Sequence, residues 1–186
     1  MPLRVNSRLV VTRSVDNIEF WGNDLALDFA NTTEGPDKDH LRSYADLVTW
    51  ARRAGALPPT ARVTRGDLDR ARELRAAIAD VFTTGGSLRT LLDFYAEAVR
   101  AGTIEDGAFT WTGRHPDRPL WPIAVAAVDL LRSDRAARVK QCDNCPWLFV
   151  DVSRNGSRRW CSMDECGTQM KQRRFVERRR RIRSAT

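Results

Sequence analysis

The chain of 186 residues has few histidines and no long apolar run. Its longest uncharged apolar stretch, residues 119–128, is about half the length of a membrane-spanning helix, so we expect a soluble protein without a membrane partner. No apolar run of secretory length follows Arg4 and Arg8, which predicts a cytoplasmic protein. The two histidines, His40 and His115, lie in polar or proline-flanked segments without metal-ligand spacing. We therefore expect both to be solvated and predict no enzyme activity.

Positive charge is balanced over most of the chain and concentrated at its end. Residues 1–137 hold 18 basic and 19 acidic side chains, whereas residues 138–186 hold 13 basic and 5 acidic ones. The whole net charge of +7 therefore arises in the last 49 residues. This asymmetry is typical of a polyanion-binding end attached to a near-neutral body. It predicts two domains, a helical body over residues 1–137 and a basic domain over residues 138–186.

All four cysteines lie in the basic domain, with the spacing C-x2-C-x15-C-x4-C at Cys142, Cys145, Cys161 and Cys166. Reduced thiols in two close pairs favour a bound metal over disulfides. Four thiolates suit one tetrahedral, structural Zn²⁺, and four protein ligands leave no open position for catalysis. A redox C-x-x-C pair and four unlinked buried cysteines are the alternatives that the spacing leaves open.

The segments between the cysteines predict a small finger. Residues 147–150 form a β-prone apolar run, residues 154–157 contain an Asn-Gly turn signal, and residues 158–160 return the chain to Cys161. We therefore expect a hairpin between the first and second cysteine pairs.

A helix is expected after the hairpin. Ser162 stands three residues before Glu165, a capping-box pattern that predicts a helix start near Met163 and places Cys166 in the first turns. A knuckle, a short hairpin and a ligand-bearing helix together predict a treble-clef-like four-cysteine zinc finger.

These residues resemble a known finger. Residues 142–167, CDNCPWLFVDVSRNGSRRWCSMDECG, followed by Lys171 and a run of arginines, are similar to the CGNR-type zinc finger of bacterial transcription regulators. The resemblance implies one structural zinc ion and DNA as the partner. The family's name quotes Cys-Gly-Asn-Arg, whereas this chain has Thr168 and Gln169 after Cys166 and Gly167. The Asn-Arg pair itself is therefore missing here, although Lys171, Arg173 and Arg174 follow closely.

The body resembles the domain that precedes such fingers. Residues 20–32, FWGNDLALDFANT, are similar to the L-D-x-x-N-T opening of the ABATE domain of stress-induced transcription regulators. In this order the two resemblances cover nearly the whole chain. They imply a helix-rich regulator.

Apolar periodicity supports a mainly α body. Helices are predicted from Ser43 to before Gly55, from Thr64 to Gly85, over about 88–100 and over 119–131. Only residues 108–112 predict a strand. In the third helix we expect the side chains of Leu91, Leu92, Tyr95 and Val99 to face inward.

Asp28, Asn31 and Thr32 form the candidate ligand pocket. Their polar side chains suit the edge of a small-molecule site, and such residues also commonly bond to backbone at turns and helix ends. Trp21, Trp50, Trp111 and Trp121 either line a cavity or pack in the core.

The candidate nucleic-acid contacts are cations and one amide of the basic domain. They are Arg154, Arg158, Arg159, Gln169, Lys171, Arg173, Arg174 and Arg178. Gln169 is the predicted base-reading residue because its amide can pair with adenine, with capping or packing of the helix as the alternative. Lys140, Arg158 and Arg159 are also suited to neutralising a zinc site with four thiolates.

The leading hypothesis is a DNA-binding transcription regulator with a helical body, a candidate sensor of a small-molecule effector. A zinc-stabilised RNA- or ribosome-associated protein is the first alternative, because a basic finger also suits RNA phosphates. The second alternative is an enzyme that acts on a small molecule, in which the finger only stabilises the body. The DNA sequence, the effector and the oligomeric state are not determined by these patterns.

Overall fold

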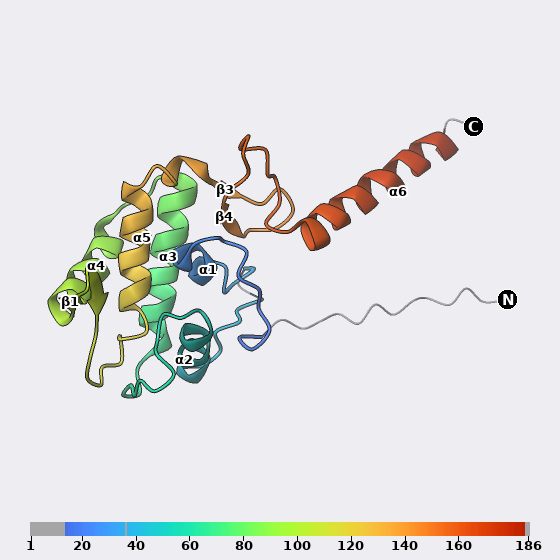
Figure 1. The fold of residues 1–186 in the computed structure, drawn as a ribbon. Helices are drawn as coiled ribbons and strands as arrows, with labels where there is room; N and C mark the ends of the chain where they lie inside the picture. The colour runs from blue at the N-terminus through green and yellow to red at the C-terminus, as the bar shows by residue number, and fades with distance from the viewer. Residues whose placement is uncertain (1–13, 36, 185–186) are drawn as a thin grey trace.

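The computed structural model describes residues 14–35 and 37–184. The body contains five helices in this part of the chain, arranged as shown in Figure 1. They are α1 (Leu25–Ala30), α2 (Tyr44–Arg53), α3 (Leu68–Thr84), α4 (Arg89–Ala101) and α5 (Trp121–Arg132). A short 3-10 helix, Ala136–Arg138, leads into the basic domain. The mainly α fold predicted from periodicity is confirmed.

The body is a layer of long helices with α1 packed against it. The helix α5 lies between α4 and α1, and α3 contacts both α1 and α4 (Figure 1). Apolar side chains surround most of α5, including the buried Ile123, Ala124 and Ala127, as expected for a central helix. These contacts bring the short helix α1 to the edge of the body that faces the basic domain.

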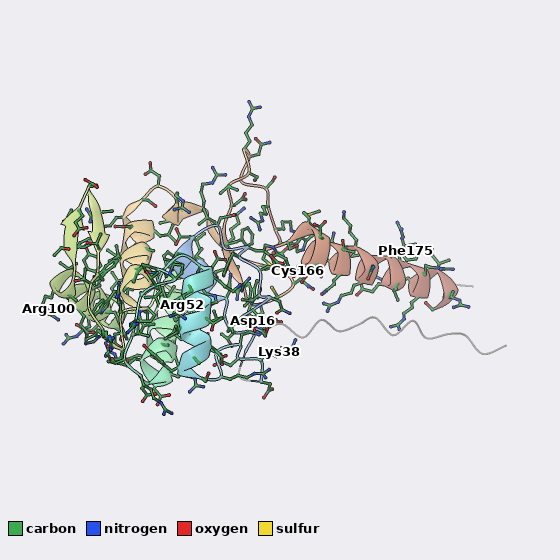
Figure 2. All side chains as sticks on the ribbon, turned by 60° about the horizontal axis from the view of Figure 1, so that its bottom comes forward. Asp16, Lys38, Arg52, Arg100, Cys166 and Phe175 are labelled. Carbon is green, nitrogen blue, oxygen red and sulfur yellow. The ribbon has the colours of Figure 1, made fainter. Side chains whose placement is uncertain are left out.

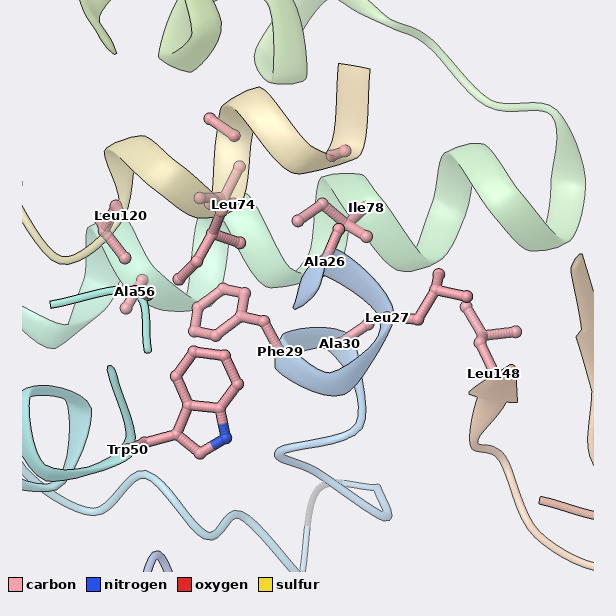
Figure 3. Packing of buried hydrophobic residues seen from close by; sticks show 14 of the residues in the cluster. Ala26, Leu27, Phe29, Ala30, Trp50, Ala56, Leu74, Ile78, Leu120 and Leu148 are labelled. Carbon is pink, nitrogen blue, oxygen red and sulfur yellow. The ribbon is translucent and has the colours of Figure 1, made fainter. Parts of the chain in front are cut away.

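The centre of the core is aromatic. Phe29 of α1 lies against Trp50 of α2, with ring centroids 5.2 Å apart, and both side chains are fully buried (Figure 3). Leu74 and Ile78 of α3 belong to the same buried cluster, with Leu74 beside Phe29 and Ile78 beside Ala26 in Figure 3. The interpretation of Trp50 as a core residue is therefore confirmed.

One of two predicted helix starts differs from the structure. The helix α2 begins as predicted, with a capping box between Ser43 and Asp46. The prediction that Thr64 opens α3 is wrong, because Asp67 is the N-cap and accepts a hydrogen bond from Asp69 N. Asp67 has extended backbone angles, and Gly66 before it lies so close to Tyr44 and Pro116 that a side chain there would clash.

The buried face of α4 is rotated relative to the prediction. Leu91, Phe94 and Ala98 are buried, whereas Leu92 and Val99 are 46% and 39% exposed. The predicted set has the same spacing of three and four residues and lies one position around the helix, so contact with α5 selects which set is buried. The inward orientation predicted for Leu92 and Val99 is therefore wrong.

A hairpin follows α4. The strand β2 (Ala108–Thr110) lies within the predicted strand and pairs with β1 (Thr103–Glu105), which was not predicted. Asp106 and Gly107, both with positive φ, join the two strands. An Asp-Gly pair at a two-residue turn is the signal that could have revealed β1.

The basic domain begins with a different hairpin from the predicted one. The strand β3 (Val139–Gln141) pairs with β4 (Leu148–Val150), so the hairpin encloses the first cysteine pair. Residues 158–160 form no strand, which corrects the predicted pairing of 147–150 with 158–160. The predicted turn at 154–157 is present, with Gly156 at positive φ.

The basic domain ends in a helix that leaves the molecule. A π-helical turn, Met163–Gly167, carries Cys166 and continues into α6 (Thr168–Ser184). The helix start predicted near Met163 is confirmed. Figure 1 shows α6 projecting away from the body, and none of its residues is buried.

Candidate metal centre, basic helix and cavity

The four cysteines meet in one cluster, although they come from three segments. Cys142 and Cys145 lie in the knuckle between β3 and β4, Cys161 ends the following loop, and Cys166 lies in the π-helical turn. Their sulfur atoms all lie within 4.8 Å of one another. Three of the Sγ–Sγ distances are 3.6 Å for Cys145–Cys161, 3.6 Å for Cys161–Cys166 and 3.7 Å for Cys166–Cys145.

These distances fit a zinc ion. A regular tetrahedron with Zn–S bonds of about 2.3 Å has edges of about 3.8 Å, close to the observed sulfur separations. The donor set of four thiolates is the one that structural zinc sites use. The cluster can therefore hold one zinc ion, which confirms the predicted cofactor.

Backbone hydrogen bonds give the cluster its shape. Cys142 N donates to Trp147 O at 2.9 Å and closes the knuckle, and Asn144 N approaches Cys142 Sγ at 3.5 Å. On the other side, Ser162 Oγ accepts from Glu165 N at 3.3 Å and caps the turn that carries Cys166. The Ser162 cap predicted from the sequence thus holds the turn that carries one ligand of the metal centre.

A buried carboxylate organises the loop after β4. Lys140 Nζ donates to Asp151 Oδ2 at 2.7 Å, and this ammonium group holds the pKa of Asp151 well below its usual range. Asp151 also accepts from Ser153 N and from Arg158 N, both at 2.9 Å. Asp151 therefore links β3 to both ends of the loop that leads to Cys161.

Arg158 has a structural position within the finger. Its guanidinium donates to the carbonyl oxygens of Trp160, Cys161 and Trp21, and it stacks over the Phe149 ring at 4.5 Å. Arg159 lies 2.5 Å from Asp143 and over the Trp160 ring. Both arginines thus contact the finger itself.

The remaining predicted contact residues are exposed. Arg154 lies in the turn after β4, and Lys171, Arg173, Arg174 and Arg178 lie along α6. In Figure 2, side chains radiate from α6 between Cys166 at its base and Phe175 farther along. Gln169, in the first turn of α6, accepts a hydrogen bond from Asn144 Nδ2 at 2.9 Å. The structure therefore connects the first turn of α6 to the metal knuckle.

The three predicted pocket residues lie at the contact between body and finger. Asn31 is buried and makes two bonds to Leu148 of β4, donating to its carbonyl oxygen at 2.8 Å and accepting from its N–H at 2.7 Å. Thr32 Oγ1 donates to Phe29 O and accepts from Arg75 Nη1. These contacts correspond to the alternative of backbone and helix-end bonding.

Asp28 accepts a hydrogen bond from Gly22 N at 2.7 Å. The carbonyl of Gly22 in turn accepts from Val150 N of β4 at 2.8 Å, so the Gly22 peptide links α1 to the finger. Burial raises the pKa of Asp28 to about 7, and the hydrogen bond from Gly22 only partly offsets it. A carboxyl group that titrates near neutrality therefore lies at this contact.

Apolar contacts complete the junction. Leu27 of α1 lies beside Leu148 of β4 (Figure 3), and Trp21 packs against Trp147 with ring centroids 5.6 Å apart. Body and finger residues belong to one buried cluster. The finger is therefore seated on α1 by both apolar and polar contacts.

A cavity of about 820 Å³ lies between the N-terminal part of the body and the finger. None of Asp28, Asn31 and Thr32 lines it. His40 does, and its side chain is 8% exposed and lies 3.5 Å from Glu34, which corrects the prediction that it is solvated. The sequence carried no signal for this cavity, because its walls come from segments that are more than a hundred residues apart.

Comparison with known proteins gives two family matches. Residues 23–134 match the sequence model of the ABATE family, described as "Putative stress-induced transcription regulator", and residues 138–179 match the CGNR zinc finger. No curated protein matches the chain. Within the described residues, no helix is long and apolar enough to cross a membrane. A helical body that covers most of the chain, followed by a four-cysteine finger, thus identifies the protein as a member of the ABATE family with a CGNR zinc finger.

Proposed function

We propose that this protein is a cytoplasmic, DNA-binding transcription regulator that acts by binding and not by catalysis. In this proposal, residues 1–137 form the regulatory body, and residues 138–186 form a finger in which a structural zinc ion fixes the base of α6. The description of the ABATE family supports regulation, and the charge distribution supports DNA as the partner.

The single observation that carries the proposal is the composition of α6. Its 17 residues, TQMKQRRFVERRRRIRS, include eight cations and one acid, and all of them lie outside the buried core. At 1.5 Å per residue the helix is about 25 Å long, enough to follow several phosphates. Because none of its residues is buried, packing against the body does not stabilise this helix. A polyanion would neutralise its charge.

The proposed phosphate contacts are the exposed cations. They are Arg154, Lys171, Arg173, Arg174 and Arg178. If about five of these reach phosphates, the logarithm of the binding constant falls against the logarithm of salt with a slope of about −4 to −5. We exclude Arg158 from this set because three carbonyl groups already engage its guanidinium, and Arg159 because it is paired with Asp143.

A charge-matched pair of variants tests the proposal in the full, zinc-loaded protein. Arg174→Ala with Arg178→Ala removes two cations from α6, and Arg62→Ala with Arg65→Ala removes two exposed cations from the body. We expect the first pair to reduce the salt slope by about two and the second to leave it unchanged. Equal losses in both pairs would contradict α6 as the contact surface, and tighter binding of RNA than of duplex DNA would support the RNA alternative.

Gln169 is the proposed base-reading residue. A bidentate contact with adenine requires its amide to exchange the bond from Asn144 for bonds to the base. We expect Gln169→Ala to lower discrimination between DNA sites by about 1–3 kcal/mol while leaving the salt slope unchanged. Uniform weakening on all sequences would instead assign Gln169 to holding the finger.

A further inference from the structure

The cavity between body and finger has the dimensions of a small-molecule site. Its volume of about 820 Å³ falls within the range of about 300–1,000 Å³ that is typical of ligand pockets. One wall comes from residues 17–42 of the body, and the other comes from residues 144–173 of the finger. A molecule bound there would touch both parts of the protein at once.

The walls carry more negative than positive charge. Five carboxylates line the cavity, from Glu19, Glu34, Asp37, Asp39 and Glu165, against three cations, from Lys38, Arg42 and Arg173. Arg75 pairs with Asp39 from outside the lining, so these side chains together carry an excess of one negative charge. Three of the four metal-ligating cysteines also line it, and a zinc ion with four thiolates has a formal charge of −2. The cavity is therefore a negatively charged hollow in a protein whose finger is strongly positive.

Two further wall residues suit an organic cation. Trp21 contributes an aromatic side chain, and aromatic rings attract ammonium and guanidinium groups through their faces. His40 is a buried polar residue of the wall, and its imidazole lies beside Glu34. Polar groups therefore line the buried part of the cavity as well as its exposed part. The lining thus combines net negative charge, an aromatic group and a buried polar group.

The cavity also reaches the proposed DNA helix. Gln169 and Arg173 lie in the first turns of α6 and line the cavity as well. Negative charge at the base of α6 repels phosphate, and a bound cation would reduce this repulsion. Occupancy of the cavity is therefore coupled to the charge that DNA encounters.

We propose that this cavity binds a small organic cation, a molecule with ammonium or guanidinium groups, and that its occupancy strengthens binding of DNA by α6. The ligand site stands independently, whereas the coupling rests on the proposed function. The cavity would make the junction between body and finger the regulatory site of the protein.

The first test compares three four-carbon probes of matched length at constant ionic strength. The probes 1,4-diaminobutane, 1,4-butanediol and succinate are titrated into the full, zinc-loaded protein, and binding is followed by NMR at the Trp21 indole and the Gln169 amide. We expect the diamine to bind with a dissociation constant at least tenfold below that of the diol and succinate not to bind. Equal binding of the diamine and the diol, or binding of succinate, would overturn the proposed ligand class.

A matched pair of variants locates the site. Glu19→Gln with Asp37→Asn removes two charges from exposed wall residues, and Glu73→Gln with Glu105→Gln removes two from exposed residues elsewhere. We expect the first pair to weaken diamine binding at least fivefold and the second to leave it unchanged. Equal weakening by both pairs would show attraction by overall charge and overturn the cavity as the site.

The second test concerns DNA. We expect saturating diamine to strengthen DNA binding of the unaltered protein about threefold relative to the Glu19→Gln, Asp37→Asn protein, in which the direct effect of the diamine on DNA is retained. An equal response of the two proteins would overturn the coupling. If the protein binds no DNA without the diamine or with it, the proposed function fails, while the probe titration still decides the cavity.

Discussion

Two helices of equal length, α3 and α6, show opposite ways of holding 17 residues in a helix. The helix α3 buries Leu68, Ala71, Leu74 and Ile78 in the core, whereas α6 buries no residue. In α3, tertiary packing supplies the stability that an isolated helix lacks. In α6, only the capped turn at the metal centre fixes one end, so the rest of the helix depends on its own sequence and on a partner.

The sequence of α6 opposes the helix when no partner is present. Arg174 and Arg178 stand four residues apart, as do Arg179 and Arg183, and like charges at this spacing cost about 0.2–0.5 kcal/mol per pair. Phe175 lies 5.6 Å from the Arg179 guanidinium, a contact that offsets part of the repulsion. The comparison indicates that α3 stabilises the folded body, whereas α6 serves the proposed interaction with DNA.

The sharpest way to break the comparison is to remove the metal centre. Cys145→Ser is expected to release α6 and the knuckle while α3 stays folded, because structural zinc contributes on the order of 10 kcal/mol to small domains. Hydrogen exchange measured across the chain should show lost protection over residues 138–184 and retained protection over residues 68–84. Val152→Ser, at a position 67% exposed in the same domain, is the matched control and should change neither. Native protection of the finger in the cysteine variant would refute a structural metal.

The second way is to cut the polar link between α1 and β4. Asn31→Ala removes both hydrogen bonds to the backbone of Leu148 and leaves a buried N–H and a buried carbonyl unpaired. We expect a loss of about 2–4 kcal/mol in the free energy of unfolding measured with denaturant. Asn155→Ala, at an exposed turn position, should cost far less. A loss of under about 0.5 kcal/mol for Asn31→Ala would show that the finger and the body are held together by apolar contacts alone.

The third effect is a pH dependence at the same junction, which is small for each pH unit. The pKa of Asp28 is raised to about 7 by burial, with Asp24 the nearby charge that raises it further. The folded protein therefore holds this proton more tightly than the unfolded chain. Stability should rise as the pH falls from about 7 toward 4, by on the order of 1 kcal/mol per pH unit from this group, and should not change through it above pH 7.

Asp28→Asn tests this contribution, since its amide oxygen can still accept the bond from Gly22. The variant should be more stable than the parent at pH 8 and should lose that share of the pH dependence between pH 4 and 7. Thermal unfolding of both proteins over this range measures the difference. Parallel stability curves for the two proteins would show that Asp28 does not titrate in the folded state at these pH values.

Local signals predicted most of the finger but not its pairing. Cysteine spacing predicted the four ligands, and Ser162 with Glu165 predicted the turn that carries Cys166, because both patterns act over a few residues. The strand partner of residues 148–150 was wrong, since the sequence contains a good turn at Gly156 as well as the metal knuckle. The sequence is compatible with a turn at either place. Closure of the knuckle around the sulfur atoms makes β3 the strand that pairs with β4.

The same division holds in the body. Periodicity predicted the four longer helices, but the six-residue α1 was missed because it is shorter than two turns of an apolar pattern. On α4, apolar residues occupy more than one face, so only contact with α5 decides that Phe94 is buried and Leu92 is exposed. His40 was likewise misjudged, because its burial depends on Glu34 and on the finger's side of the cavity.

The sequence by itself determined the helical body, the four-cysteine cluster and the concentration of positive charge in the last 49 residues. Each of these depends on residue type and on short spacings, which local geometry constrains strongly. Tertiary structure alone decided that Asn31 bonds to the backbone of β4 and that the Arg158 guanidinium bonds to the Trp21 carbonyl. It also decided that an acidic cavity lies at the base of α6. These features join residues more than a hundred positions apart, and only packing of the finger on α1 brings such residues together.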